Sequence, residues 1–199
     1  MLLDIVAVVL SYLIGSVSFS IVIAKWVKGI DIRQHGSGNA GATNTLRVLG
    51  KGPGIFVFSL DIAKGILSVY LGNTLGSNGW IPVVCGLAAI VGHNWPIWFK
   101  FKGGKGIATT IGVIATLAFF PALYAGIIAI LAIVLTRYVS LGSLIFAGLL
   151  PVFILLFQFT WPLLSAALAI AIFAFVRHRT NIVKLIQGTE NKLGAKKGA

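Results

Sequence analysis

The segment from Gln34 to Asn44, QHGSGNAGATN, has the composition of a loop that binds an anion. The eight residues from Ser37 to Asn44 are all Gly, Ala, Ser, Thr or Asn. Glycines let the backbone approach a ligand closely, so that successive N–H groups can surround one anion. Arg47 follows and can hold phosphate oxygens in a fork. The candidate binding residues of this segment are Ser37, Gly38, Asn39, Gly41, Thr43 and Asn44.

A second segment, FKGGKG, has the same character. Gly103, Gly104 and Gly106 surround Lys105, immediately before an apolar run that begins at residue 107. The unpaired N–H groups at the start of a helix favour a phosphate. A nucleotide-binding P-loop is excluded because Lys105 is followed by glycine and not by Ser or Thr. Either segment alone would favour a flexible connector, but two of them on one side, each beside a cation, favour an anion site.

The three histidines differ in their surroundings. His178 lies at the end of the last apolar run, and Asn181 follows three residues later, on the same face if that helix continues. His178 is therefore the best candidate for a general base or a phosphate donor; the alternative is a polar residue at the membrane interface. His93, near Pro96, fits a residue that orients a loop or bonds a backbone carbonyl and is also a candidate for substrate binding, and His35 fits an exposed position.

Other kinds of chemistry lack the residues they need. A divalent-metal site requires clustered carboxylates, and no metal site or cofactor is expected. A serine-nucleophile motif of the G-x-S-x-G kind is absent. The single cysteine, Cys85, excludes an intramolecular disulfide. The carboxylates are Asp4, Asp31, Asp61 and Glu190.

The composition is that of a polytopic membrane protein. The chain is 58% hydrophobic and 10% charged, with a mean hydropathy of +1.00, whereas soluble domains carry about a quarter charged residues. The net charge of +12 is better explained by cytoplasmic loops that collect Lys and Arg than by nucleic-acid binding. We expect one membrane-embedded all-α domain over residues 1–199, with a disordered basic tail at 193–199.

Seven transmembrane helices are predicted from the apolar runs. Residues 107–136 could form one helix kinked at Pro121 or two helices, and the positive-inside rule favours two. With the N-terminus outside and the C-terminus cytoplasmic, every Lys and Arg except Lys64 falls on the cytoplasmic side. The runs are 3–27, 53–72, 80–99, 107–119, 121–136, 142–157 and 161–176.

The polar segments all fall on that cytoplasmic side, where they can build one site. Ser143, in the third segment, is a further candidate binding residue. Asp61 and Lys64 lie inside the second run, three residues apart on one helix face. An ion pair that pins packing explains them at least as well as a catalytic role. The segments are QHGSGNAGATN with Arg47, then 92–110, 137–143 and 177–190.

At these segments the sequence resembles a known family. GSGNAGATN-TLRVLG, GHNWPIWFKFKGGKGIAT and RHRTNIVKLIQGTE, together with LDIAKG and TRYVSLGS, are similar to the motifs of the bacterial acyl-phosphate:glycerol-3-phosphate acyltransferases, the PlsY family. The resemblance runs from about residue 10 to residue 192. Lys184 stands where the family pattern leads us to expect Arg, so a bidentate contact there is in doubt.

The resemblance implies an activity. The family transfers a fatty acyl group from acyl phosphate to the sn-1 hydroxyl of glycerol 3-phosphate, which gives lysophosphatidic acid and phosphate and begins phospholipid synthesis. It implies the cytoplasmic face of the bacterial inner membrane as the location. The implied partners are the two substrates, membrane lipid and the soluble enzyme that makes acyl phosphate, with no nucleic acid.

Roles for the candidate residues follow from this resemblance as hypotheses. Acyl phosphate carries a good leaving group, so alignment and charge stabilisation are the main tasks. Ser37, Thr43, Asn44 and Lys105, with the glycine N–H groups, would hold acyl phosphate. Arg47, Ser143, His178 and Asn181 would hold glycerol 3-phosphate. The base is either His178 or a phosphate oxygen of the substrate.

Two other functions fit less well. A small transporter or anion channel would explain the intramembrane Asp61 and Lys64, but the glycine segments all lie on one side and the spans show no inverted repeat. A CDP-alcohol phosphatidyltransferase would need spaced aspartates and a divalent metal, which this chain does not supply.

Overall fold

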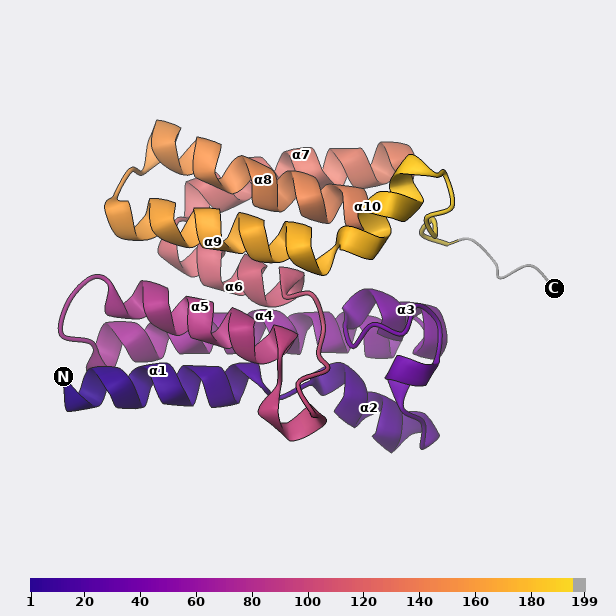
Figure 1. Cartoon of the computed structure of the whole chain (residues 1–199), viewed down its shortest axis with the longest axis horizontal. Helices are drawn as coiled ribbons and strands as arrows, with labels where there is room; N and C mark the ends of the chain where they lie inside the picture. Colours follow the sequence, from indigo (N-terminus) through magenta and orange to yellow (C-terminus); the bar gives the residue numbers. More distant parts are fainter. Residues whose placement is uncertain (195–199) are drawn as a thin grey trace. The chain divides into compact units, whose positions relative to one another are not determined.

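The computed structural model describes residues 1–194, and its regular elements there are α-helices and two short 3-10 helices. The predicted all-α fold class is confirmed for this part of the chain. The chain divides into two compact units, Met1–Leu117 and Ala118 onward, which are described separately (Figure 1). The helices are α1 Leu2–Gly15, α2 Phe19–Lys28, α3 Ala42–Leu49, α4 Lys51–Leu75, α5 Ile81–Asn94, α6 Ile107–Leu117, α7 Phe119–Thr136, α8 Val139–Phe157, α9 Trp161–Arg177 and α10 Arg179–Ile186, with 3-10 helices η1 Ile32–Gln34 and η2 Ile97–Phe99.

In the first unit the long helix α4 packs against α1, α5 and α6. Glycines make the close crossings possible: Gly15 of α1 faces the backbone of Ala89, and Gly65 of α4 faces the backbone of Thr109. Small residues at helix crossings let backbones approach, as they do in membrane bundles. The short elements α2, η1 and α3 gather at one end of this unit (Figure 1), and that end carries both glycine segments.

The first apolar run forms one candidate span, Leu2–Lys28, as predicted, but the helix is interrupted within it. α1 ends at Gly15 and α2 begins at Phe19. The break leaves backbone carbonyls without helical partners, and the ammonium of Lys64 donates to one of them, the carbonyl of Val17, across 2.8 Å. A side chain of α4 thus stabilises the break.

In the second unit α8 packs against both α7 and α9, and α10 follows α9 at a bend of 62°. The preference for two helices over one kinked helix in residues 107–136 is confirmed, because α6 ends at Leu117 and α7 begins at Phe119. Pro121 lies in the first turn of α7, where the missing N–H group costs no helical hydrogen bond.

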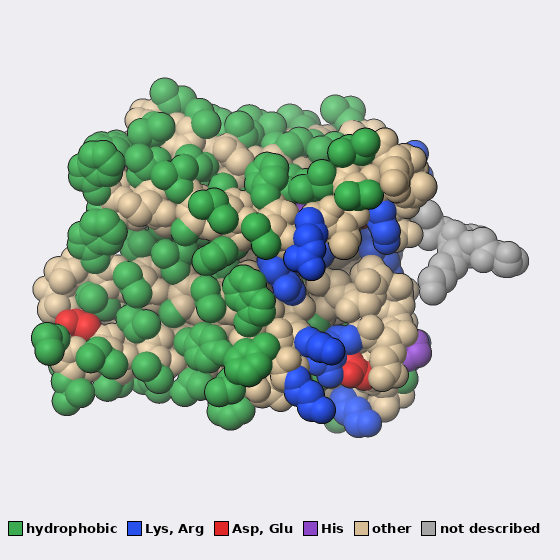
Figure 2. Space-filling view, viewed as in Figure 1, with side chains coloured by type: hydrophobic (Ala, Val, Ile, Leu, Met, Phe, Trp, Pro, Cys, Tyr) green, Lys and Arg blue, Asp and Glu red, His purple; other side chains and the backbone are tan. Residues whose placement is uncertain are grey.

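Five helical segments of the described residues are long and apolar enough to cross a membrane, or six if the bent pair α9 and α10 forms one span. α6 is apolar but shorter. Large apolar side chains cover the shafts of the helices of each unit (Figure 2). The count of seven spans, the external N-terminus and the cytoplasmic C-terminus stay predictions.

The disorder expected for residues 193–199 stays a prediction, and the first of these residues, Leu193, is hydrogen-bonded to Arg137. Its backbone N–H donates to the carbonyl of Arg137 across 2.7 Å. The guanidinium of Arg137 in turn donates to the carbonyl of Leu193, from Nη2 at 2.8 Å. Residues 195–199 of the predicted tail lie outside the described residues.

Candidate active site

The first glycine segment is held in shape by Asn44, a fully buried residue in the first turn of α3. Its Oδ1 accepts from the backbone N–H of Ser37 (2.8 Å). Its Nδ2 donates to the carbonyls of Ile32 (3.1 Å) and His35 (2.9 Å). Both amide hydrogens are used inside the loop, so Asn44 shapes the loop, and its binding of a substrate stays a prediction.

The rest of this segment leaves its polar groups accessible. Gly36 and Gly38 turn the chain with φ values of 63° and 73°, a region in which glycine avoids steric cost. Ser37 and Gly38 are exposed, and Asn39 and Thr43 are half-buried.

Gly41 is the N-cap of α3. The segment therefore runs into a helix N-terminus, as the anion-site prediction requires. Arg47 lies in the last turn of the same helix and is exposed. The glycine segment and the Arg47 guanidinium are therefore at opposite ends of the short helix α3.

The second glycine segment folds back onto the end of α5. The backbone N–H groups of Gly103 and Gly104 donate to the carbonyls of Asn94 (3.3 Å) and His93 (3.1 Å). Gly106 has a φ of 82°. Its carbonyl accepts from the N–H of Thr110 (2.7 Å), and this hydrogen bond closes the first turn of α6. Half-buried Lys105 is thus held between two fixed glycines at a helix N-terminus.

The two glycine segments meet. A Cβ atom added to Gly104 would collide with the carbonyl oxygen of Ala40 and with Nε2 of His93. Arg33 ties the same two segments, because its Nη1 donates to the carbonyl of Phe99 across 3.0 Å. The prediction that the first two polar segments come together is confirmed.

Arg33 is itself fixed by Asp31. The Nη2 and Nε groups of Arg33 donate to the Asp31 carboxylate at 2.7 Å and 3.0 Å, and the backbone N–H of Arg33 donates to Oδ1. Hydrogen bonding from the Arg33 side chain, ahead of its backbone N–H and charge, lowers the pKa of Asp31 below the usual range.

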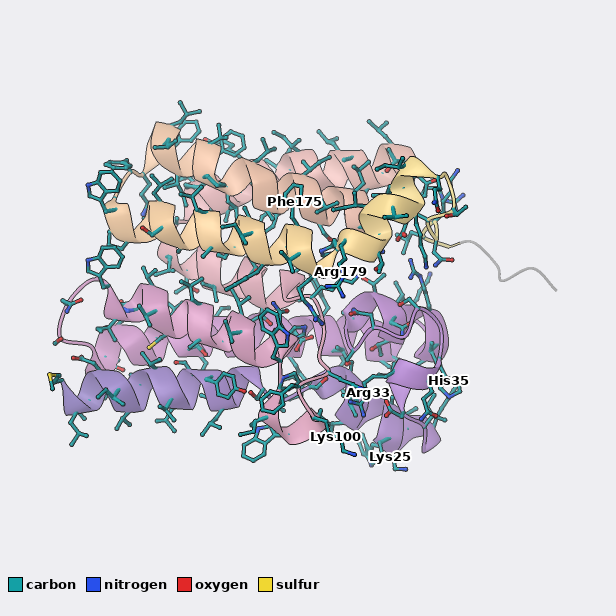
Figure 3. The ribbon with its side chains drawn as sticks, viewed as in Figure 1. Lys25, Arg33, His35, Lys100, Phe175 and Arg179 are labelled. Atoms are coloured by element: carbon teal, nitrogen blue, oxygen red, sulfur yellow. The ribbon has the colours of Figure 1, made fainter. Side chains whose placement is uncertain are left out.

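Arg33, Lys25, His35 and Lys100 all lie at this end of the first unit (Figure 3), where most of its Lys and Arg side chains gather (Figure 2).

Beneath the second segment lies a buried charged cluster. Asp61, Lys64 and His93 are 1%, 3% and 5% exposed. Lys64 Nζ lies 2.8 Å from Asp61 Oδ1 and 2.9 Å from His93 Nδ1. The ion-pair interpretation of Asp61 and Lys64 is confirmed, and His93 extends that pair to the loop, in line with the expectation that it orients a loop.

In the second unit Glu190 joins two polar residues of different elements. Its Oε1 accepts from Asn181 Nδ2 of α10 (2.8 Å) and from Ser140 Oγ of α8 (3.0 Å). Glu190 is 8% exposed. The carboxylate therefore fixes the Asn181 amide against α8. Ser143, one turn beyond Ser140, is also buried, and its hydroxyl donates to the carbonyl of Val139 (2.9 Å).

His178 caps the end of α9. Its Nδ1 lies 2.8 Å from the carbonyl oxygen of Ala174. A carbonyl only accepts, so Nδ1 carries a hydrogen, and a neutral ring then has its lone pair on Nε2. The helix axis bends by 62° at His178, so the condition for His178 and Asn181 to share one face, a helix that continues, is not met. Asn181 instead takes its orientation from Glu190.

Three features escaped the sequence analysis. Two of them are the ion pair of Asp31 with Arg33 and the contacts of Glu190 with Asn181 and Ser140. No sequence motif marks either one, and the only signal was an acidic residue close in sequence to an Arg or Asn. Asn94 received no role, yet it is fully buried and neither of its amide atoms has a hydrogen-bond partner among the described residues. Its Oδ1 faces Gly106. Within residues 1–194 no three His, Cys, Asp or Glu side chains gather as a metal site would require.

Two glycine segments meet beside Arg33 and carry a lysine at a helix start, an arrangement that can hold a phosphate group. A family model described as glycerol-3-phosphate acyltransferase matches residues 5–188. This chain belongs to the glycerol-3-phosphate acyltransferase family. The resemblance to the PlsY family is therefore confirmed, and both units fall within the family match.

Relatives of known name agree. The glycerol-3-phosphate acyltransferase of Shouchella clausii is 59% identical over 203 residues, which cover 98% of this chain and 99% of the relative. That of Halalkalibacterium halodurans is 56% identical and covers 94% of each chain.

A crystal structure of PlsY (YgiH), an integral membrane glycerol 3-phosphate acyltransferase in its glycerol 3-phosphate form, is 38% identical. It superposes with a TM-score of 0.91 over 96% of both chains. A second crystal structure of PlsY, in its lysophosphatidic acid form, has a TM-score of 0.88 and covers 96% of this chain and 95% of that one. Members of the glycerol-3-phosphate acyltransferase family with this fold are membrane enzymes, so this chain is an integral membrane acyltransferase.

Proposed function

We propose that this enzyme transfers a fatty acyl group from acyl phosphate to the sn-1 hydroxyl of glycerol 3-phosphate. The hydroxyl oxygen attacks the acyl carbonyl carbon, the bond to the phosphate oxygen breaks, and phosphate leaves with the electron pair. The hydroxyl proton goes to a base, and the products are lysophosphatidic acid and phosphate. The observation that carries the proposal is the meeting of two glycine segments at Gly104, Ala40 and Arg33, in a chain of this family.

The first unit binds acyl phosphate in this scheme. The side chains of Ser37, Thr43 and Lys105 surround the phosphate of the mixed anhydride, and the glycines let the two loops approach it closely. Acyl phosphate needs little activation of its leaving group. Positioned donors and the Lys105 ammonium are sufficient, because they stabilise the charge that develops on the carbonyl and phosphate oxygens. The other candidates of the glycine segments, Gly38, Asn39, Gly41, Gly103, Gly104 and Gly106, shape this site; the N–H groups of Gly38, Gly41, Gly103 and Gly104 donate to backbone carbonyls of the protein.

For glycerol 3-phosphate we keep the roles that the sequence suggests: those of Ser143, His178 and Asn181 in the second unit, and that of Arg47 in the first. The crystal structure of PlsY in its glycerol 3-phosphate form supports this substrate for the family. The Nε2 lone pair of His178, left by the Nδ1 bond to Ala174, is suited to accept the hydroxyl proton. The alternative base is a phosphate oxygen of the substrate itself.

The reaction takes place at the cytoplasmic face of the bacterial inner membrane. Seven spans with an external N-terminus put nearly every cation on that side, where glycerol 3-phosphate is available. The lipid tail of acyl phosphate and of the product stays in the bilayer, and the soluble enzyme that forms acyl phosphate supplies the donor.

Product analysis with purified protein in detergent tests the proposal. With palmitoyl phosphate and glycerol 3-phosphate we expect equal amounts of phosphate and sn-1 lysophosphatidic acid, and no product from palmitoyl-CoA. A chelator should leave the rate unchanged. Phosphate release that does not depend on glycerol 3-phosphate, or acyl transfer from palmitoyl-CoA alone, would overturn it. Activity in detergent also separates an acyltransferase from a transporter, which needs a sealed vesicle.

A further inference from the structure

The buried cluster of Asp61, Lys64 and His93 is not used by the proposed reaction, yet it touches the loop that is. Lys64 and Asp61 lie on α4 and His93 lies near the end of α5. The three are at most 5% exposed. Charged groups at such depth are retained when they are paired and have a role. Packing alone would not need His93 to lie against a glycine loop.

The Lys64 ammonium has three N–H donors and three close partners. The carbonyl of Val17 accepts across 2.8 Å, and Nδ1 of His93 lies at 2.9 Å. Asp61 Oδ1 lies at 2.8 Å, as a close contact that is not aligned as a hydrogen bond, so it is the counter-ion. The ammonium thus contacts the break before α2, its own helix α4 and helix α5 of the first unit.

These contacts fix the hydrogen of the His93 ring. An ammonium cannot accept, so Nδ1 of His93 is the acceptor, and a neutral imidazole then carries its hydrogen on Nε2. A proton moved from Lys64 to the ring would lie farther from the carboxylate, because His93 Nδ1 is 3.5 Å from Asp61 Oδ1 whereas Lys64 Nζ is 2.8 Å away. The Coulomb energy favours the charge on the lysine.

The Nε2 edge of this ring faces the point where the two glycine segments meet. It fills the space that a Cβ of Gly104 would occupy, beside the carbonyl of Ala40. The carbonyl of His93 accepts from the N–H of Gly104 (3.1 Å). One residue therefore contacts the loop through both its ring and its backbone.

We propose that His93 is a positioning residue, locked by Lys64 and Asp61 as the neutral Nε2–H tautomer, that sets the two glycine segments for the phosphate of acyl phosphate. The kinetic test of this inference rests on the proposed function, whereas the test of the tautomer does not. It assigns the intramembrane ion pair to shaping the site and not to transport. Three buried side chains thereby hold an exposed loop from inside the bundle.

Imidazole ¹⁵N NMR of the purified protein in detergent tests the tautomer without any activity. With the other two histidines, His35 and His178, assigned by substitution, we expect His93 to show an unprotonated Nδ1 and a protonated Nε2. The neutral pair Asp61→Asn/Lys64→Met, which leaves no lone buried charge, should lose this pattern. A doubly protonated ring, or a hydrogen on Nδ1, in the unmodified protein would overturn the proposal.

Kinetics test the positioning role. His93→Gln keeps an amide near the Nε2 position, whereas His93→Asn does not. We expect His93→Asn to raise KM for palmitoyl phosphate about tenfold, which is the loss of about one hydrogen bond of 1.4 kcal/mol, with KM for glycerol 3-phosphate changed less than about twofold. His93→Gln should recover most of the loss, and Ser11→Ala, which removes a buried α1–α4 hydrogen bond (3.5 Å), should leave KM unchanged.

Folded variants whose KM for palmitoyl phosphate equals that of the unmodified enzyme would contradict the positioning role, even if they melted at lower temperature. If the unmodified enzyme made no product from acyl phosphate, the proposed function would fail while the NMR result still decided the tautomer.

Discussion

The guanidinium of Arg33 donates to the backbone carbonyl of Phe99 across 3.0 Å, and this bond joins segments 66 residues apart in the chain. Asp31 holds the same guanidinium from the other side, with an Nη2–Oδ2 distance of 2.7 Å. A planar guanidinium can satisfy a carboxylate and a carbonyl together because its five donors point in fixed directions. Arg33 is therefore the clasp between the two glycine segments.

Loss of this clasp should loosen the acyl-phosphate site. Arg33→Gln removes a charged hydrogen bond of about 1.5–3 kcal/mol, and we expect KM for palmitoyl phosphate to rise about tenfold or more at unchanged expression. Lys100→Gln is the control, because it removes the same charge from an exposed side chain next to Phe99. Equal effects of the two substitutions would show that only the overall positive charge matters.

The clasp also predicts a pH dependence of stability. Hydrogen bonding from Arg33 lowers the pKa of Asp31, so the folded state gains stability from this pair above the ordinary aspartate pKa of about 4. That contribution is lost as the pH falls through the lowered pKa. The difference in Tm between the unmodified protein and Asp31→Asn in detergent should therefore shrink below about pH 4.

Both side chains of the clasp are about a quarter to a third exposed, at 26% and 31%, so solvent screening keeps this stabilisation to about 1 kcal/mol or less. A Tm difference that stays constant, or grows, down to about pH 3 would mean that Asp31 does not contribute through its charge.

The contacts of Glu190 with Asn181 and Ser140 predict a defect confined to the second substrate. Glu190→Ala leaves the Asn181 amide without the acceptor that now lies at 2.8 Å, and we expect KM for glycerol 3-phosphate to rise about tenfold. KM for palmitoyl phosphate should change little. Glu190→Gln keeps one acceptor oxygen and is the matched control. The assignment fails if Glu190→Ala binds glycerol 3-phosphate as the unmodified enzyme does.

The identity of the base is decided by His178→Asn. An asparagine amide can still donate to the carbonyl of Ala174, as Nδ1 now does at 2.8 Å, but it lacks Nε2. If His178 accepts the proton, kcat should fall about 100-fold or more, with the melting temperature retained. A fall of less than about tenfold would assign the base to a phosphate oxygen of the substrate.

The class of fold could be predicted from the sequence, since hydropathy is a local property. The meeting of the glycine segments could be predicted because the positive-inside rule places both on one side of the membrane. The break at Val17 was not predictable, because the residue that stabilises it, Lys64, is 47 positions away. The bend at His178 was missed for a similar reason. Helical periodicity continues through Asn181, and the contact that orients this residue comes from Glu190 in a later loop.

The role of Asn44 shows a different limit. Its residue type is suited to binding a ligand or to holding a turn, and only the hydrogen bonds of both Nδ2 hydrogens decide for the turn. Lys105 and Gly104 could be assigned to a loop from the motif alone, but the neighbours of Gly104, Ala40 and His93, could not.

Comparison of Lys105→Gln with Lys102→Gln tests most directly whether the second glycine segment binds the phosphate of the donor. Both changes remove one charge from the same loop, but Lys105 is half-buried between Gly104 and Gly106 whereas Lys102 is exposed. We predict that kcat/KM for palmitoyl phosphate falls about 100-fold for Lys105→Gln, as for loss of a charged hydrogen bond of about 3 kcal/mol, and less than about twofold for Lys102→Gln. Equal losses in the two variants, or full activity of Lys105→Gln, would contradict the account.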